Sequence, residues 1–206
     1  MKKTLLAVNL CLLTTATLAI ANRAQAEGDP QAGKTKAAQC VACHGADGNS
    51  LAAAFPKIAG QGEKYLLKQM QEIKEGVRPI AQMAGQLDNM SDQDLQDIAS
   101  YYAGQTMSGS AAKKDLVDMG ASVYRAGIKK QGIAACTGCH SPTGVGNAPA
   151  GFPRLSGQHA DYIEQQLLMF QTGERNNDVD SVMRSITERM TAKEIKAVSS
   201  YASGVR

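Results

Sequence analysis

The stretch Cys40-Val41-Ala42-Cys43-His44 returns 96 residues later in the chain as Cys136-Thr137-Gly138-Cys139-His140. A second stretch, Phe55-Pro56-Lys57, returns at an offset of 97 residues as Phe152-Pro153-Arg154. Matches of residue type in a constant order indicate an internal duplication. The fold is therefore decided by one module that occurs twice.

The repeat divides the 206 residues into two parts of similar length. We predict domains at residues 27–105 and 116–206, joined by a linker at residues 106–115 that begins with small and polar residues. Apolar residues recur at helical spacing between helix-capping residues and helix-ending glycines, and no stretch alternates like a β-strand. The sequence predicts an all-α protein with two tandem domains related by duplication.

Each predicted domain is small for a unit that builds its core from side chains alone. The whole chain has three Phe and no Trp. Small domains with few aromatic residues are only marginally stable unless another group fills the core. A large, flat, apolar cofactor in each half would supply that core.

Residues 1–26 have the form of a cleaved export signal. Lys2 and Lys3 precede an apolar run, which ends at the small-x-small sequence Ala24-Gln25-Ala26. A retained membrane anchor is the alternative, but the apolar run is short for a spanning helix. Removing the segment leaves 22 − 3 = 19 basic residues against 19 acidic residues. We therefore expect an exported protein whose composition gives no reason to propose nucleic acid as a partner.

The repeated C-x-x-C-H motif has the chemistry of covalent haem attachment. Two thiols one helical turn apart can add across the two vinyl groups of one haem, and the adjacent histidine can then ligate the iron. A redox-active dithiol, a disulfide and a zinc site are the alternatives, but none of them needs the repeated histidine. We expect two c-type haems, covalently bound, one per domain (Cys40, Cys43 and His44; Cys136, Cys139 and His140).

Methionine is the natural candidate for the second axial ligand, because a thioether stabilises reduced iron. Each half contains two repeated methionines. Met90 and Met190 stand directly before helix-capping residues, where packing onto the following helix explains them. Met83 and Met183 lie in stretches that we expect to be irregular. We predict that these two ligate the irons, with core packing as the alternative.

Several other repeated residues are candidates for supporting positions. Pro56 and Pro153 follow the motif histidines by 12 and 13 residues, and a backbone carbonyl there could accept the imidazole N–H. An ordinary turn is the alternative reading. His159 matches Gly62 of the other half and is expected on the surface near a helix start. Six polar residues could contact haem propionates or simply be solvated (Lys57, Arg154, Gln61, Gln158, Arg78 and Arg175).

At these residues the chain resembles the class I c-type cytochromes, and its duplication is similar to the arrangement in the dihaem cytochrome c₄ family. The resemblance covers residues 27–206. It implies two cytochrome c-like haem domains with His/Met ligation and with the proline carbonyls as the partners of the histidines. It also implies a periplasmic carrier of single electrons, not an enzyme, that acts between a quinol-oxidising complex and a terminal oxidase, with the membrane surface as a candidate location.

Two other functions stay open at this point. A dihaem peroxidase-like enzyme would have one open iron site, and a haem sensor would have an exchangeable ligand. Both differ from the carrier in how they respond to carbon monoxide or cyanide, which closed irons do not bind. No small-molecule substrate is expected for the carrier.

The two halves carry opposite charge. Residues 27–105 contain seven Lys and Arg against ten Asp and Glu (7 − 10 = −3), and residues 106–206 contain 12 against nine (12 − 9 = +3). Such a charge distribution can orient a carrier on its partner, and it can also help the two halves attract each other.

Overall fold

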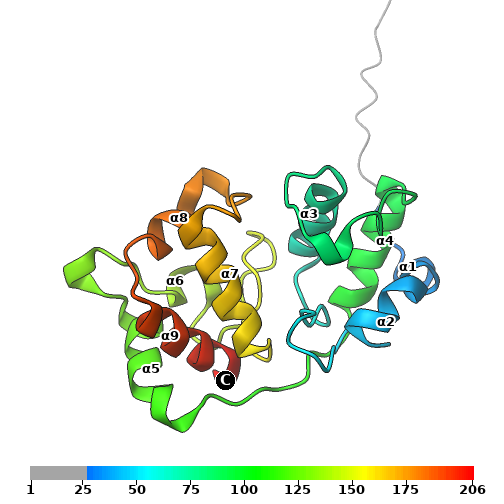
Figure 1. Ribbon diagram of the computed structural model, residues 1–206. Helices are drawn as coiled ribbons and strands as arrows, with labels where there is room; N and C mark the ends of the chain where they lie inside the picture. The colour runs from blue at the N-terminus through cyan, green and yellow to red at the C-terminus, as the bar shows by residue number, and fades with distance from the viewer. Residues whose placement is uncertain (1–26) are drawn as a thin grey trace, which may run out of the picture.

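The computed structural model describes residues 27–206, so the predicted export signal at residues 1–26 lies outside the described residues. The described chain forms two helical lobes joined by an irregular connecting segment along one side (Figure 1). Within residues 27–206 there are helices, turns and two isolated β-bridges but no β-strand, and none of the helices is long and apolar enough to cross a membrane. The all-α, two-domain prediction is confirmed.

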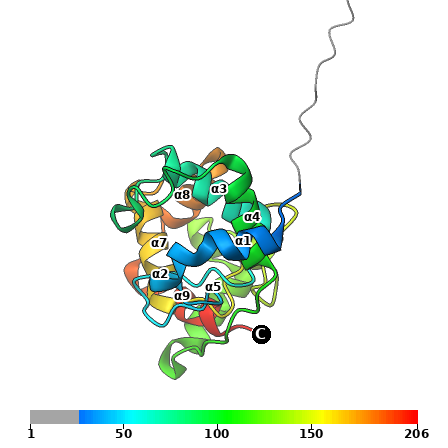
Figure 2. The ribbon, with the colours of Figure 1, turned by 90° about the vertical axis from the view of Figure 1, so that its right-hand side faces the viewer.

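The two lobes contain corresponding helices. The first lobe contains α1 (Pro30–Lys36), η1 (Ala37–Cys40), α2 (Val41–His44), α3 (Glu63–Lys74), η2 (Ala81–Met83) and α4 (Asp92–Ala103). The second lobe contains η3 (Lys114–Leu116), α5 (Val117–Ala126), η4 (Lys129–Gln131), α6 (Thr137–His140), α7 (Ala160–Thr172), η5 (Val179–Ser181), α8 (Val182–Thr187) and α9 (Ala192–Gly204). Viewed at a right angle to Figure 1, α1 and α2 of the first lobe lie in front of the second lobe (Figure 2).

Local sequence signals explain where the main helices begin. The Asp29 carboxylate accepts from the backbone N–H groups at the start of α1, and Pro30 occupies the first helical position. Thr191 and Glu194 form a capping box at the start of α9. Ser91 forms the same arrangement with Asp94 at the start of α4.

In each lobe the first and last long helices cross closely and the middle helix packs against the last one. Gly33 of α1 meets the backbone of α4, where an added Cβ would lie 2.0 Å from the Asp97 carbonyl oxygen. Gly120 of α5 occupies the same position against α9, with an added Cβ 2.3 Å from the Ala197 carbonyl oxygen. Only glycine permits this approach. The first cysteine of each C-x-x-C-H motif, Cys40 or Cys136, packs against the core to which the last helix of its lobe contributes.

The segment between the lobes is attached to both of them. Met107 is buried. The buried Lys57 ammonium of the first lobe donates to the Ser108 hydroxyl at 2.8 Å. The Lys113 N–H donates to the Ser200 hydroxyl of α9. The connection therefore has fixed partners on both sides, which limits how far the lobes can move apart.

Candidate haem sites

Each C-x-x-C-H motif forms a single helical turn. In α2 and α6 the turn ends on the histidine, and His44 and His140 are both buried. The residue after each histidine has a positive φ, 81° at Gly45 and 67° at Ser141, so the chain turns sharply away. This turn leads to the loop that carries the repeated Phe-Pro pair. The loop thus returns to the histidine 12 or 13 residues after leaving it.

The two histidines are held in the same way. His44 Nδ1 lies 2.8 Å from the Pro56 carbonyl oxygen, and His140 Nδ1 lies 2.9 Å from that of Pro153. The hydrogen bond suggested by the proline spacing is therefore present in both copies. Burial lowers the pKa of both imidazoles, and the proline carbonyls only partly oppose this effect. Each ring is thus neutral at pH 7, with Nδ1–H donating.

The second ring nitrogen is the one that can ligate a metal. Within residues 27–206, the only ring hydrogen bonds of His44 and His140 are those of Nδ1, so Nε2 has no hydrogen-bond partner there. A neutral imidazole whose Nδ1–H is fixed by a carbonyl presents a lone pair on Nε2, which is the usual state of a metal-bound histidine. The donor set fits axial ligation of a haem iron.

The thiols do not have the properties of a reactive dithiol. Burial raises the pKa of the Cys40 thiol and raises that of Cys136 to about 11. A nucleophilic cysteine needs a lowered pKa, so these two thiols are poorly suited to disulfide exchange. The four cysteines of residues 27–206 are unpaired, and no group of three metal-ligating side chains forms there. The two motifs do not combine into one zinc site.

The methionine segments differ between the copies. Met83 ends the short turn η2, which agrees with the expected irregular stretch. Met183 does not: it is the second residue of helix α8, so the expectation of an irregular stretch around it was wrong. The start of α8 is difficult to recognise in the sequence, because Asp180 in the preceding turn η5 has a non-helical backbone conformation and no helical pattern leads into Met183.

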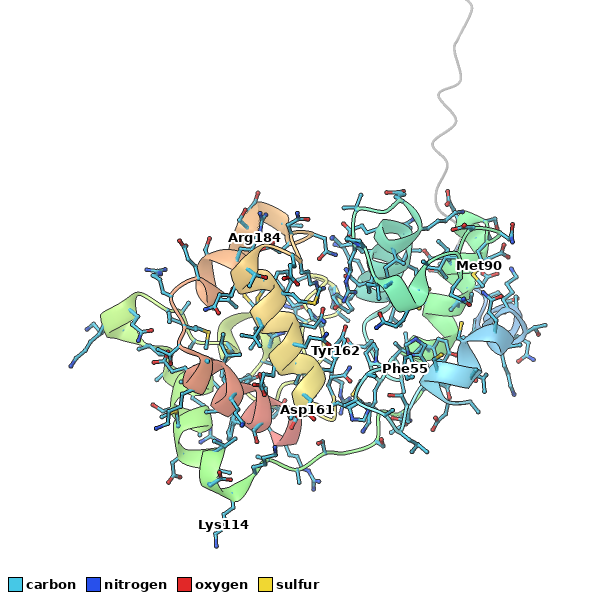
Figure 3. All side chains as sticks on the ribbon, in the orientation of Figure 1. Phe55, Met90, Lys114, Asp161, Tyr162 and Arg184 are labelled. Carbon is cyan, nitrogen blue, oxygen red and sulfur yellow. The ribbon has the colours of Figure 1, made fainter. Side chains whose placement is uncertain are left out.

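The other two methionines pack as the sequence predicts, against apolar residues of the helix that follows each of them. Met190 is buried in the core of the second lobe together with Ile195 of α9. Met90 packs against the core of the first lobe, away from the boundary between the lobes (Figure 3). Neither needs a ligand role to explain its position.

Two buried arginines lie at the boundary between the lobes. Arg78 donates to Gln69, Tyr162 and Gln166, and Arg175 donates to Gln69, Gln166, Tyr65 and Asn177. Tyr162 is visible on α7 where it faces the first lobe (Figure 3). All these partners are neutral, and within residues 27–206 neither guanidinium forms a salt bridge.

The charge of this arginine pair calls for an anion. Arg78 is 6 % exposed and Arg175 is 7 % exposed. Burial would raise the pKa of the nearby Tyr65 hydroxyl, but the positive charges of Arg175 and Arg78 outweigh burial and lower it. Buried charges without a directly bonded counter-ion are costly, and the nearby Glu72 carboxylate is bonded to Lys68 and Asn177, not to a guanidinium. Haem propionates are anions of the right kind, so the residues present fit the group.

Sequence reasoning misjudged several residues at this boundary. His159 stands at the start of α7 as expected, but it is only half exposed: its Nε2 lies 3.0 Å from the Ser50 hydroxyl and 3.1 Å from the Ser50 carbonyl oxygen of the other lobe. Gln61 and Gln158 are buried, not solvated. The only sequence signal was their recurrence in matching Gly-Gln pairs, which shows a shared role but not that the role lies in the other domain.

Comparisons with known proteins find similar chains over both lobes. The Cytochrome c family model matches twice, at residues 30–104 and 118–205. A Pseudomonas aeruginosa protein named cytochrome c4 is 55 % identical over 190 residues, covering 92 % of this chain and 94 % of that protein. The crystal structure of reduced recombinant cytochrome c4 from Pseudomonas stutzeri has a TM-score of 0.85 and 50 % identity, covering 87 % of this chain and all of that chain. A Thiomonas intermedia protein named thiosulfate dehydrogenase electron acceptor is 35 % identical, covering 81 % and 78 %.

Proposed function

The chain belongs to the cytochrome c family, in its duplicated cytochrome c₄ branch, and we propose on this premise that it carries single electrons in the periplasm. Family membership supports a dihaem electron-transfer cytochrome. The observation that carries the proposal is the matched pair of histidines, each with Nδ1 held by a proline carbonyl and Nε2 free. Two similar haem sites, each with a histidine ligand on one side of the iron and a methionine on the other, would leave no iron position open to a substrate. Such sites suit an electron carrier better than an enzyme.

The residues of each domain have distinct tasks in this proposal. The cysteines would hold one haem per domain through thioether bonds, and a histidine and a methionine of the same domain would ligate its iron. When bound, the haem iron supplies the one-electron chemistry. Pro56 and Pro153 orient the histidines, and Arg78 and Arg175 neutralise the propionates. The proposed attachment and ligand residues are Cys40, Cys43, His44 and Met83 in the first domain and Cys136, Cys139, His140 and Met183 in the second.

The test is a spectroscopic redox titration of the holoprotein combined with addition of carbon monoxide. We expect two haems, neither of which binds carbon monoxide. Met83→Ala and Met183→Ala should each open one haem to it, whereas the matched controls Met90→Ala and Met190→Ala should open none. Binding by the unaltered protein would favour the peroxidase-like or sensor function. Opening by Met90→Ala would show that the ligand assignment is wrong.

The partners proposed are a quinol-oxidising complex or another redox protein as donor and a terminal oxidase as acceptor. One relative is named as the electron acceptor of a dehydrogenase, which supports a protein donor. The opposite charges of the two halves would orient the protein on such partners, in the periplasm or at the membrane surface. Electron transfer should then slow as ionic strength rises, and a rate independent of salt would contradict steering.

A further inference from the structure

Two buried glutamines connect the domains through the backbone. Gln158 of the second lobe accepts from the Lys57 N–H at 2.9 Å and donates to the Lys57 carbonyl at 2.8 Å. Gln61 of the first lobe accepts from the Arg154 N–H at 2.9 Å and donates to the Arg154 carbonyl at 2.6 Å. The exposed fractions of Gln61 and Gln158 are 5 % and 3 %. Each glutamine therefore forms a pair of hydrogen bonds with the backbone of one residue in the opposite domain. We call each pair of hydrogen bonds a grip; the two grips are reciprocal.

The gripped N–H groups belong to the peptides that hold the histidines. The Pro56 carbonyl and the Lys57 N–H are the two ends of one peptide group. That peptide accepts from His44 Nδ1 at one end and donates to Gln158 Oε1 at the other. The peptide between Pro153 and Arg154 does the same between His140 and Gln61. An unbroken hydrogen-bonded path thus runs from each histidine to a glutamine of the other domain.

The glutamines are anchored in their own domains. Each follows a glycine with positive φ, 61° at Gly60 and 88° at Gly157. The Gly60 N–H donates to the Tyr102 carbonyl of α4, and the Gly157 N–H donates to the Ser203 carbonyl of α9, both at 2.8 Å. The last helix of one domain therefore fixes the side chain that polarises the histidine peptide of the other domain.

We propose that Gln61 and Gln158 are positioning residues that tune the axial histidine of the opposite domain. Accepting from the peptide N–H polarises the peptide and makes its carbonyl a stronger acceptor. A stronger bond to Nδ1–H gives the imidazole more anionic character and makes it a better donor to oxidised iron. Each glutamine thus lowers the reduction potential of the haem in the other domain. The inference rests on the proposed histidine ligation.

The test compares Gln158→Met and Gln61→Met in the holoprotein, with each variant serving as the matched control for the other. Each variant removes one of the two grips between the domains. If the only consequence were a weaker interface, each variant would change the reduction potentials of both haems to a similar extent. The proposal predicts a crossed result: Gln158→Met favours reduction of the first-domain haem, by about threefold in its reduced-to-oxidised ratio at a fixed applied potential, and Gln61→Met favours that of the second. Haem-resolved NMR during a redox titration measures both.

Two further readouts separate this effect from packing. In the reduced holoprotein, Gln158→Met should move the NMR signal of the His44 Nδ1 proton and speed exchange of the Lys57 amide, while the His140 and Arg154 signals stay in place. Gln158→Glu and Gln61→Glu keep the acceptor oxygen and should not raise either potential. Uncrossed shifts, or a rise in the Glu variants, would overturn the proposal. Failure of the proposed function would instead appear as missing haem or absent histidine ligation in the unaltered protein.

Discussion

The two domains agree on the histidine side of the site and differ on the methionine side. The imidazole-to-proline distances are 2.8 and 2.9 Å, and both rings are equally buried. Met83 instead ends a short turn, whereas Met183 lies in a helix. The duplication has therefore kept the geometry around the motif histidine, while the local support of the proposed methionine ligand has diverged. Differences between the two centres should arise mainly from the methionine segments.

The support of Met183 is also more elaborate. Asp180 and Ser181 have φ of 54° and 57°, a conformation that costs energy for residues other than glycine. Just before them, the Asp178 carboxylate accepts from the Arg184 backbone N–H at 3.0 Å and from its Nε at 2.7 Å. These two hydrogen bonds between Asp178 and Arg184 form a brace, which encloses the strained turn and Met183. No residue of the first domain forms a corresponding ion pair around Met83 within the described chain.

The largest predicted effect tests whether the two sites are independent. The double variant Cys40→Ser/Cys43→Ser should lose the covalent haem of the first domain and keep that of the second, and Cys136→Ser/Cys139→Ser should do the reverse. Serine cannot form the thioether bond. Mass spectrometry of the denatured protein counts the attached haems. Loss of both haems from either variant would contradict two separately assembled domains.

The next effect concerns the shared arginine pair. Arg78→Met or Arg175→Met would leave a buried anion without its partner, and we expect each to lower the free energy of unfolding of the holoprotein by about 3 kcal/mol. Arg125→Met is the control, because this exposed arginine stacks on Tyr201 and should cost less than about 1 kcal/mol. Denaturant unfolding measures all three. Equal costs for the buried and exposed variants would argue against a buried counter-ion.

A smaller effect should separate the two methionine segments. Asp178→Ala removes the brace, and we expect it to destabilise the second domain by about 1–3 kcal/mol. It should also make that domain's haem partly accessible to carbon monoxide. Asp88→Ala, at an exposed position shortly after Met83, is the matched control and should change neither property. Thermal unfolding followed by haem-resolved NMR distinguishes the domains. Opening of the first-domain haem by Asp178→Ala would contradict the assignment of the brace to Met183.

Sequence reasoning predicted the parts of the structure that local physics determines. Thr191 and Glu194 identify a helix start, and the spacing from His44 to Pro56 identifies a carbonyl within reach of the ring. Periodicity failed at Met183, because two left-handed residues before α8 disguise its helix. The cross-domain role of Gln158 depends on how the domains pack, which no local pattern encodes.

The smallest predicted effect uses a difference between the two helix crossings. The Asp97 carboxylate of α4 accepts from Lys36 Nζ, from the Asp29 N–H and from Gln93, whereas the matching position in α9 is Ala197. Burial alone would raise the pKa of Asp97, but these donors, the Lys36 ammonium foremost, hold it below its usual range. The carboxylate therefore stabilises the folded domain fully above pH ~4, its unfolded pKa, and this stabilisation is lost as pH falls through the lower folded pKa.

Asp97→Ala should consequently flatten the acid dependence of the first domain's stability and leave the second domain unchanged. The capping-box acids Asp94 and Glu194 also have lowered pKa values, but only Asp94 is paired with an ammonium, that of Lys36, which it shares with Asp97. Asp94 therefore adds to the acid dependence of the first domain, and Asp97→Ala should remove only part of it. Asp178→Ala is the corresponding experiment in the second domain, where it should flatten the acid dependence of stability. Burial alone would raise the pKa of Asp178, but the hydrogen bonds from Arg184 outweigh burial and lower this pKa as well. Amide exchange resolved by domain between pH 5 and pH 3 measures both slopes. If Asp97→Ala left the first domain's slope intact, the acid dependence of the α1–α4 crossing would come from other carboxylates, and its assignment to Asp97 would be wrong.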